Sequence, residues 1–74
     1  MKDAVIIYYK DKDQEQDKIQ SVVDLVGTIL NVHVTRATVL MEHYGFIFPV
    51  INLGTRLYGY KDGVDAIKEI YLNK

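Results

Sequence analysis

A single proline, Pro49, stands inside the apolar segment 45–54, and it restricts what this part of the chain can form. Proline has no backbone N–H to donate to a sheet, so it is normally kept out of central strands. A cis bond between Phe48 and Pro49 at the head of a buried strand is one solution, because an X-Pro bond favours trans by only about 0.5–1 kcal/mol. A trans proline at the first residue of a strand or at a bulge is the other.

The composition predicts one small globular domain that spans residues 1–74. The chain is 49% hydrophobic and 26% charged, which supplies the apolar side chains that a minimal core needs. Nine basic and ten acidic residues leave a formal net charge of −1. This balance disfavours nucleic acid as a partner, because a nucleic-acid surface needs clustered Lys and Arg.

The absence of cysteine removes several kinds of chemistry at once. A chain without Cys has no disulfides, no thiolate nucleophile and no Cys-ligated metal. His33 and His43 are too few and too separated for a metal site, so we expect no metal and no cofactor. No segment approaches the ~18 apolar residues of a membrane span, and the apolar run at the N-terminus is too short for a secretion signal. We therefore expect a cytoplasmic protein.

The first half of the chain alternates between strand and helix patterns. Residues 4–9 are a continuous apolar run, typical of a central strand that is covered on both faces. Residues 13–30 carry apolar side chains at helical spacing opposite a polar face, with Asp13 as the expected N-cap. Residues 31–37 alternate apolar and polar, which indicates a half-exposed strand. A strand, a helix and a strand predict a right-handed parallel unit.

The middle of the chain predicts a short helix followed by the proline-bearing strand. Thr38 is the expected N-cap of a helix over residues 39–44, and Gly45 is placed to end it in a left-handed conformation. Residues 46–53 are apolar and rich in β-branched and aromatic side chains, so we predict a strand there.

The C-terminal third predicts a hairpin and a last helix. Gly54 supplies a tight turn, and residues 55–59 return as the second strand. Residues 62–72 have an apolar stripe at helical spacing. Asp62 and Asp65 resemble a capping box in which Asp replaces the usual Glu. The expected element order is β-α-β-α-β-β-α.

This order, together with three short motifs, resembles the minimal thioredoxin fold of the glutaredoxins. Residues 40–45 (Leu-Met-Glu-His-Tyr-Gly) look like the short helix that ends in Tyr-Gly, and residues 48–51 (Phe-Pro-Val-Ile) resemble the cis-proline strand. Residues 57–62 are similar to the hairpin end before the last helix. The resemblance favours the cis bond at Pro49. It also implies an α/β domain with a four-stranded mixed sheet in the order 2-1-3-4, the outer helices on one face and the short helix on the other.

The resemblance lacks the residue that gives glutaredoxins their activity. In that family a Cys-x-x-Cys motif or a single Cys sits at the N-terminus of the first helix, a place that here falls on Asp13, Gln14, Glu15 and Gln16 or a near neighbour. Thiol–disulfide exchange requires a thiolate, so this redox catalysis is excluded at this site. The carboxylates of Asp13, Glu15 and Asp17 could be interpreted as an acid–base or hard-cation site, but helix first turns ordinarily collect acidic residues.

The resemblance also implies a remnant of the groove that holds glutathione in the family. There, strand-edge amides beside the cis-proline and the N-terminus of the last helix contact the peptide. A purely structural interpretation remains open, in which Pro49 shapes the strand and Asp62 caps the helix. The groove candidates are Phe48, Pro49, Val50, Gly59, Tyr60, Lys61 and Asp62.

Arg56, Tyr58 and Tyr60 alternate onto one face of the predicted last strand. Because Tyr and Arg are enriched at interface hot spots, this ladder is a candidate protein contact surface. A partly covered sheet face is an equal alternative, since Tyr is a normal occupant of such faces.

These observations favour a non-enzymatic protein-interaction module on a redox-inactive, glutaredoxin-like scaffold, with a protein as its partner. The alternative is a binder of a small, glutathione-like ligand that uses the cis-proline groove. A third hypothesis is an enzyme of another mechanism that uses Asp13 or Glu15. A partly exposed edge strand would also permit a homodimer.

Overall fold

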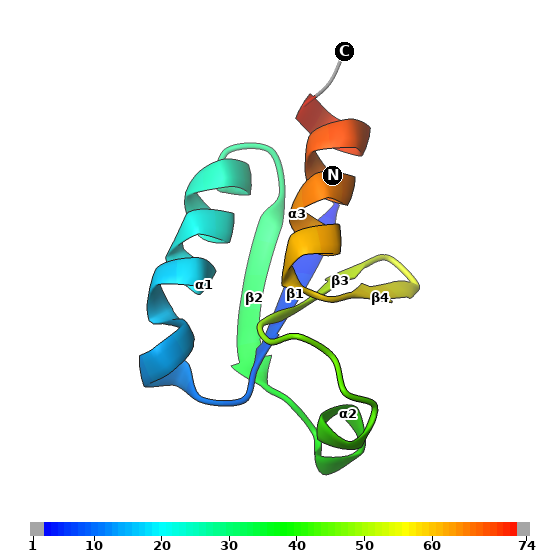
Figure 1. The fold of residues 1–74 in the computed structure, drawn as a ribbon. Helices are drawn as coiled ribbons and strands as arrows, with labels where there is room; N and C mark the ends of the chain where they lie inside the picture. Colours follow the sequence, from blue (N-terminus) through cyan, green and yellow to red (C-terminus); the bar gives the residue numbers. More distant parts are fainter. Residues whose placement is uncertain (1–2, 73–74) are drawn as a thin grey trace.

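A four-stranded mixed sheet in the order β2-β1-β3-β4 is the framework of the computed structural model, which describes residues 3–72 (Figure 1). β1 (Ala4–Tyr9) pairs parallel with β2 (Asn31–Arg36) and antiparallel with β3 (Val50–Leu53). β3 also pairs antiparallel with β4 (Arg56–Tyr58). The predicted α/β class, strand order and mixed character of the sheet are confirmed.

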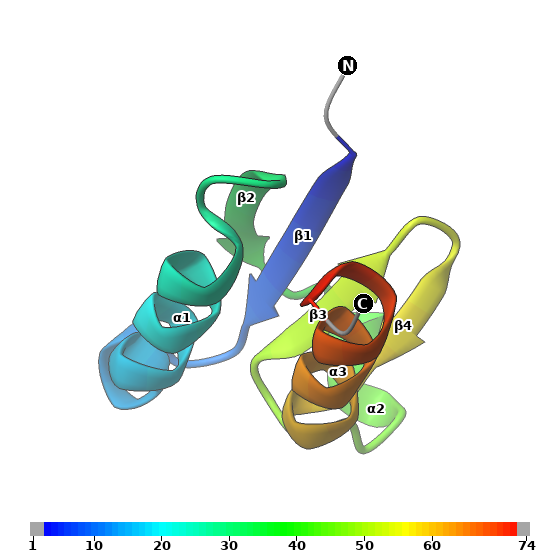
Figure 2. The same ribbon diagram turned by 90° about the horizontal axis from the view of Figure 1, so that it is seen from above.

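Two longer helices cover one face of the sheet. α1 (Lys12–Val26) and α3 (Tyr60–Ile67) lie side by side on that face, and α3 continues as the π-helical segment η1 (Lys68–Leu72) (Figure 2). α2 (Val39–His43) lies at one end of the sheet and packs against its other face. This arrangement agrees with the predicted placement of the helices.

The core lies between the sheet and the two longer helices. Val5 and Ile7 of β1 are fully buried there, in register with Leu53 and Ile51 of β3. Apolar side chains of α1 and Ile67 of α3 complete this cluster. A second, smaller cluster lies on the opposite face, where Met41 of α2 packs with Ala37 and Val50, and with Tyr8, Phe46 and Phe48. Period-two alternation along the strands separates the two clusters.

α1 differs from its predicted bounds at both ends. It starts at Lys12 with Asp11 as the N-cap, so the prediction of Asp13 as the cap is wrong. The α-helix ends at Val26, not at residue 30. Leu30 nevertheless belongs to the core, because the turn after α1 brings it back and its N–H donates to the Val26 carbonyl at 2.9 Å. A buried residue beyond the helix end therefore extended the apparent periodicity.

The segment around Pro49 is mostly loop. The Phe48–Pro49 bond is cis, as predicted, but β3 starts at Val50 and not at residue 46. Gly45 has a φ of 72°, and Thr38 caps α2 by accepting a hydrogen bond from the Met41 N–H at 3.2 Å, both as predicted. The aromatic pattern of residues 46–49 reflects packing on the second cluster instead of strand pairing.

The hairpin is shorter and the last helix begins earlier than predicted. β4 ends at Tyr58, and Gly59 is the N-cap of α3, with no side-chain capping bond. The predicted capping box of Asp62 and Asp65 is therefore wrong. The Gly63 N–H donates to the Gly59 carbonyl at 2.8 Å, which places Asp62 inside the first turn.

Gly63 lets α3 approach β3 closely, so we predict that Gly63→Ala destabilises the fold. An added Cβ would lie 2.7 Å from Cβ and Cδ1 of Ile51, a side chain with 0% exposure. Overpacking costs about 1–3 kcal/mol, against a gain of at most about 1 kcal/mol in helix propensity. Urea unfolding measures the change, and Asp65→Ala, at an exposed position of α3, is the matched control with an effect within about 0.5 kcal/mol. Equal or greater stability of Gly63→Ala would contradict the packing.

Candidate functional site

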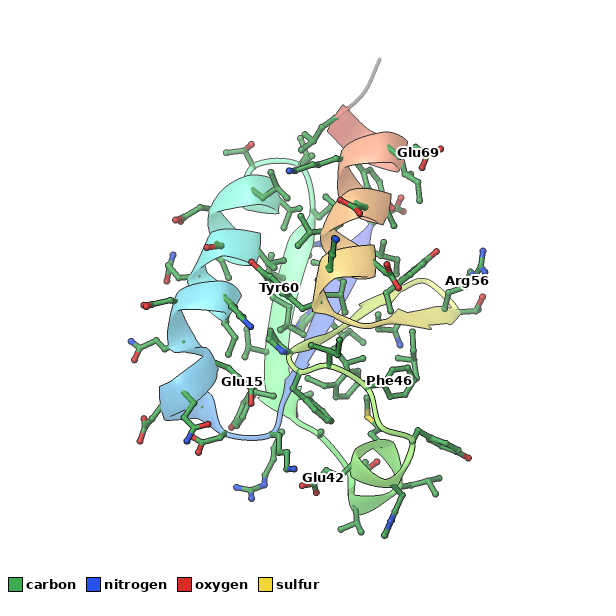
Figure 3. The ribbon with its side chains drawn as sticks, viewed as in Figure 1. Glu15, Glu42, Phe46, Arg56, Tyr60 and Glu69 are labelled. Carbon is green, nitrogen blue, oxygen red and sulfur yellow. The ribbon has the colours of Figure 1, made fainter. Side chains whose placement is uncertain are left out.

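Carboxylates of Asp11 and Glu15 accept hydrogen bonds from backbone N–H groups at the start of α1. The Asp11 side chain accepts a hydrogen bond from the Gln14 N–H at 3.3 Å. Glu15 turns back toward the loop before the helix, where its carboxylate accepts from the Asp11 N–H at 2.7 Å and from the Lys10 N–H at 3.2 Å (Figure 3). Glu15 is also the one charged residue of the described chain with a buried side chain. The N–H groups of Lys10, Asp11 and Gln14 at this helix start thus already have carboxylate acceptors from the same segment.

This arrangement explains the acidic first turn without catalysis. Asp13 is exposed in the first turn, as are Gln14 and Gln16, while Glu15 alone points inward. Neighbouring cations lie over aromatic rings, with the Lys12 ammonium 5.8 Å from the Tyr9 ring centroid. Within residues 3–72 no group of three or more His, Asp or Glu side chains is arranged to hold a metal ion. The geometry supports the interpretation that the acidic residues stabilise the start of the helix.

The predicted groove residues meet at the same end of the sheet as the start of α1. The Tyr60 N–H donates to the Ile47 carbonyl at 3.1 Å, which joins the loop before Pro49 to the start of α3. A Cβ at Gly59 would lie 3.8 Å from Ile47 atoms, so the two segments are in van der Waals contact. The structure therefore brings the loop of Phe48 and Pro49 next to Gly59 and Tyr60.

Not every member of the predicted groove is available to a ligand. Pro49 and Val50 are buried, whereas Lys61 and Asp62 are exposed. Tyr60 is half-buried between α1 and α3, with the Lys18 ammonium 5.3 Å from its ring centroid (Figure 3). At this place, the side chains that a ligand could contact are those of Phe48, Tyr60 and the two charged residues after Tyr60.

The predicted ladder of Arg56, Tyr58 and Tyr60 is divided by the structure. The Arg56 guanidinium lies 5.6 Å from the Tyr58 ring centroid on β4. Tyr60 belongs to α3 and lies apart from Arg56 (Figure 3). The prediction of one shared strand face is wrong, because the strand ends at Tyr58 and the helix begins two residues later. Tyr58 and Tyr60 both pack against the main core.

A cavity of about 560 Å³ lies at the opposite end of the sheet, beside the β3–β4 turn. Arg56 and Tyr58 line it together with Asn52, Asp3 and Tyr71. The Tyr71 hydroxyl donates to Asp3 Oδ2 at 3.4 Å. Partial burial, reinforced by the Asp3 charge and this hydrogen bond, raises the pKa of Tyr71 above the ordinary value of 10.0. The sequence pattern did not indicate this cavity, because its residues come from both ends of the described chain and from the β3–β4 hairpin.

The most exposed apolar side chains lie on α2 and in the loop after it. Val39 is 69% exposed, Leu40 61%, Tyr44 68% and Ile47 67%. We call these four residues the α2 surface. Leu40 lies on α2, and Tyr44, four residues later, is the C-cap of the helix. Sequence reasoning missed them, although three consecutive apolar residues on a helix of five cannot all face the core, and only Met41 does.

A comparison with protein-family models, with curated proteins and with solved structures finds no match to this chain. Within residues 3–72, no helix has the length and apolar character required to span a bilayer.

We predict that Glu15→Ala destabilises the protein by about 1.5–3 kcal/mol, the range for hydrogen bonds to a charged group. The substitution leaves the Lys10 and Asp11 N–H groups without their acceptor. Asp13→Ala removes an exposed carboxylate from the same first turn and costs only about 0.3–1 kcal/mol. Thermal and urea unfolding of both variants measure the difference. Equal effects of the two substitutions would show that Glu15 acts only through its charge.

Proposed function

We propose that this protein is a non-catalytic interaction module on a glutaredoxin-like scaffold of the thioredoxin fold, and that it acts through protein contact. The strand order 2-1-3-4 and the three helices support the scaffold. The lack of cysteine and the carboxylate-bonded start of α1 support the absence of thiol–disulfide chemistry there. The observation that carries the proposal is the exposed apolar α2 surface.

The α2 surface is unusual because it exposes several large apolar side chains to solvent. Single exposed apolar residues are normal, whereas contiguous exposed apolar area marks interaction sites. Here four side chains within residues 39–47 each keep more than 60% of their surface exposed. Full burial of one such side chain contributes about 1.5–3 kcal/mol. A partner that covers the α2 surface would therefore gain apolar burial at all four side chains, which offsets part of the cost of association.

The helix that carries the α2 surface also packs against the sheet. Met41 is buried against Val50 and Ala37, so the helix that presents Val39 and Leu40 is anchored to the sheet. The Tyr44 and Phe46 rings meet edge to face with centroids 6.3 Å apart, which connects the exposed Tyr44 to the half-buried Phe46. An anchored surface loses little conformational entropy when a partner binds.

We predict that Leu40→Asp combined with Ile47→Asp lowers the affinity for a protein partner about tenfold or more, because two apolar contacts are lost. Affinity capture from a lysate of the native host, with a photo-crosslinking residue at Val39, identifies the partner for titration with purified components. The matched control is Ile70→Asp, which places the same charge at a 57% exposed apolar position of η1.

The control variant should bind like the wild type, and both variants should keep the wild-type melting temperature. Equal affinity of the double variant, or crosslinks with no preferred partner, would refute the proposal.

A small-ligand binder remains the second candidate, favoured by the contact between the Pro49 loop and the start of α3. The hydrogen bond from the Tyr60 N–H to the Ile47 carbonyl joins this loop to the start of α3, where Lys61 and Asp62 are exposed. Glutathione titrated against labelled protein distinguishes the candidates. Saturable amide shifts at Phe48, Tyr60 and Asp62 that Lys61→Glu weakens would support the binder, whereas unchanged spectra at millimolar glutathione would exclude it.

A further inference from the structure

β2 is an edge strand of the sheet, and its six residues make it twice as long as the other edge strand, β4. The N–H groups of Asn31 and Ala37 donate to the carbonyls of Asp3 and Tyr9 at 2.9 and 2.8 Å. Because successive residues of a strand direct their backbone groups to opposite sides, odd-numbered residues of β2 face β1. Val32, Val34 and Arg36 therefore direct their N–H and C=O groups outward, along an edge that no strand within residues 3–72 pairs with.

This edge lacks the usual protection against pairing. Proteins blunt exposed edges with Pro, Lys, bulges or very short strands. β2 has the sequence Asn-Val-His-Val-Thr-Arg and keeps unbroken register with β1 over its whole length. Val34, near its middle, is 40% exposed although its side chain lies on the face that α1 covers. Seen along the sheet, α1 lies over this face and leaves the outer side of β2 open (Figure 2).

We propose that β2 pairs antiparallel with β2 of a second copy, about a two-fold axis at Val34, so that one continuous sheet runs through both copies. With the axis at Val34, the pairs are Val34 with Val34, and Val32 with Arg36 of the other copy. All outward-facing residues then form hydrogen-bonded pairs of the antiparallel ladder. An axis at His33 or Thr35 would leave one of these residues outside the ladder.

The side chains favour the same axis. The two Val34 side chains lie opposite each other and cover the exposed part of both. Arg36 lies beside Val32 of the other copy, so the two arginines stay apart. Val32 follows the turn from the C-terminal end of α1, whose last turn contains no basic residue. The incoming Arg36 therefore approaches the negative end of that helix, which is favourable for a cation.

A charge exchange at Val34 tests the pairing, because this residue is its own partner. Sedimentation velocity over a range of concentrations should show a reversible dimer of the wild type. Val34→Lys and Val34→Glu should each raise the dimer dissociation constant about tenfold or more, and an equimolar mixture of the two variants should recover dimerisation. Circular dichroism melts verify that the single variants fold, as expected for a position that is 40% exposed.

The control is the Leu40→Asp and Ile47→Asp double variant, which leaves the β2 edge unchanged and should dimerise like the wild type. A filtered NOE measurement on a mixed-label wild-type sample gives a second readout, since this register puts His33 next to Thr35 of the other copy. A monomer at all concentrations, a dimer lost only in the double variant, or a charge-exchanged mixture that stays monomeric would each overturn the proposal.

Discussion

The antiparallel pairing of β1 with β3 is the interaction on which the rest of the structure depends. The N-terminal half forms a β-α-β unit and the C-terminal half a β-β-α unit, and the sheet joins them only through this pair of strands. Ile7 and Ile51 lie opposite each other at its centre, both fully buried. A slip of one residue would turn Asn52 toward the core and Ile51 toward the other face. The register therefore determines which side chains α1 and α3 can cover.

The same pairing distributes the functional candidates around the molecule. It sets the end of β1 beside the start of β3, so that the start of α1, the Pro49 loop and the start of α3 gather at one end of the sheet. α2 extends from that end and exposes the α2 surface. The cavity beside Asp3 and Tyr71 lies at the other end of the sheet, and β2 forms one edge of the sheet. The proposed protein contact and the proposed self-association would thus use separate surfaces.

Much of this fold could be predicted from the pattern of apolar residues. The continuous run of β1 gave a correct strand because cover on both faces leaves a direct record in sequence. The alternation of β2 also gave a correct strand, although only Val32 among its residues is half-buried and the others are exposed. Caps were less predictable. Asp11 competes with Asp13 for the start of α1, and only the inward turn of Glu15 decides between them. β4 was predicted too long, since Tyr58 and Tyr60 look alike in sequence although the strand ends at Tyr58 and a helix begins at Tyr60.

The candidate site was harder to predict than the fold, because exposure is a property of the assembled protein. Val39, Leu40 and Met41 are equally apolar in sequence, yet only Met41 meets the sheet. A resemblance to glutaredoxins directs attention to the Pro49 groove, where the structure buries Pro49 and Val50. The proposed function depends instead on the exposed apolar residues of the α2 surface.

The β1–β3 register can be measured directly by NMR. Odd-numbered residues of β1 direct their backbone groups toward β2, so Ile7 and Ile51 form a non-hydrogen-bonded pair, in which the Cα atoms lie about 4.5 Å apart. We expect a strong NOE between the Hα protons of Ile7 and Ile51, and another between those of Val5 and Leu53. An Hα–Hα NOE from Ile7 to Val50 or Asn52 in its place would contradict the register, and with it the surfaces inferred from it.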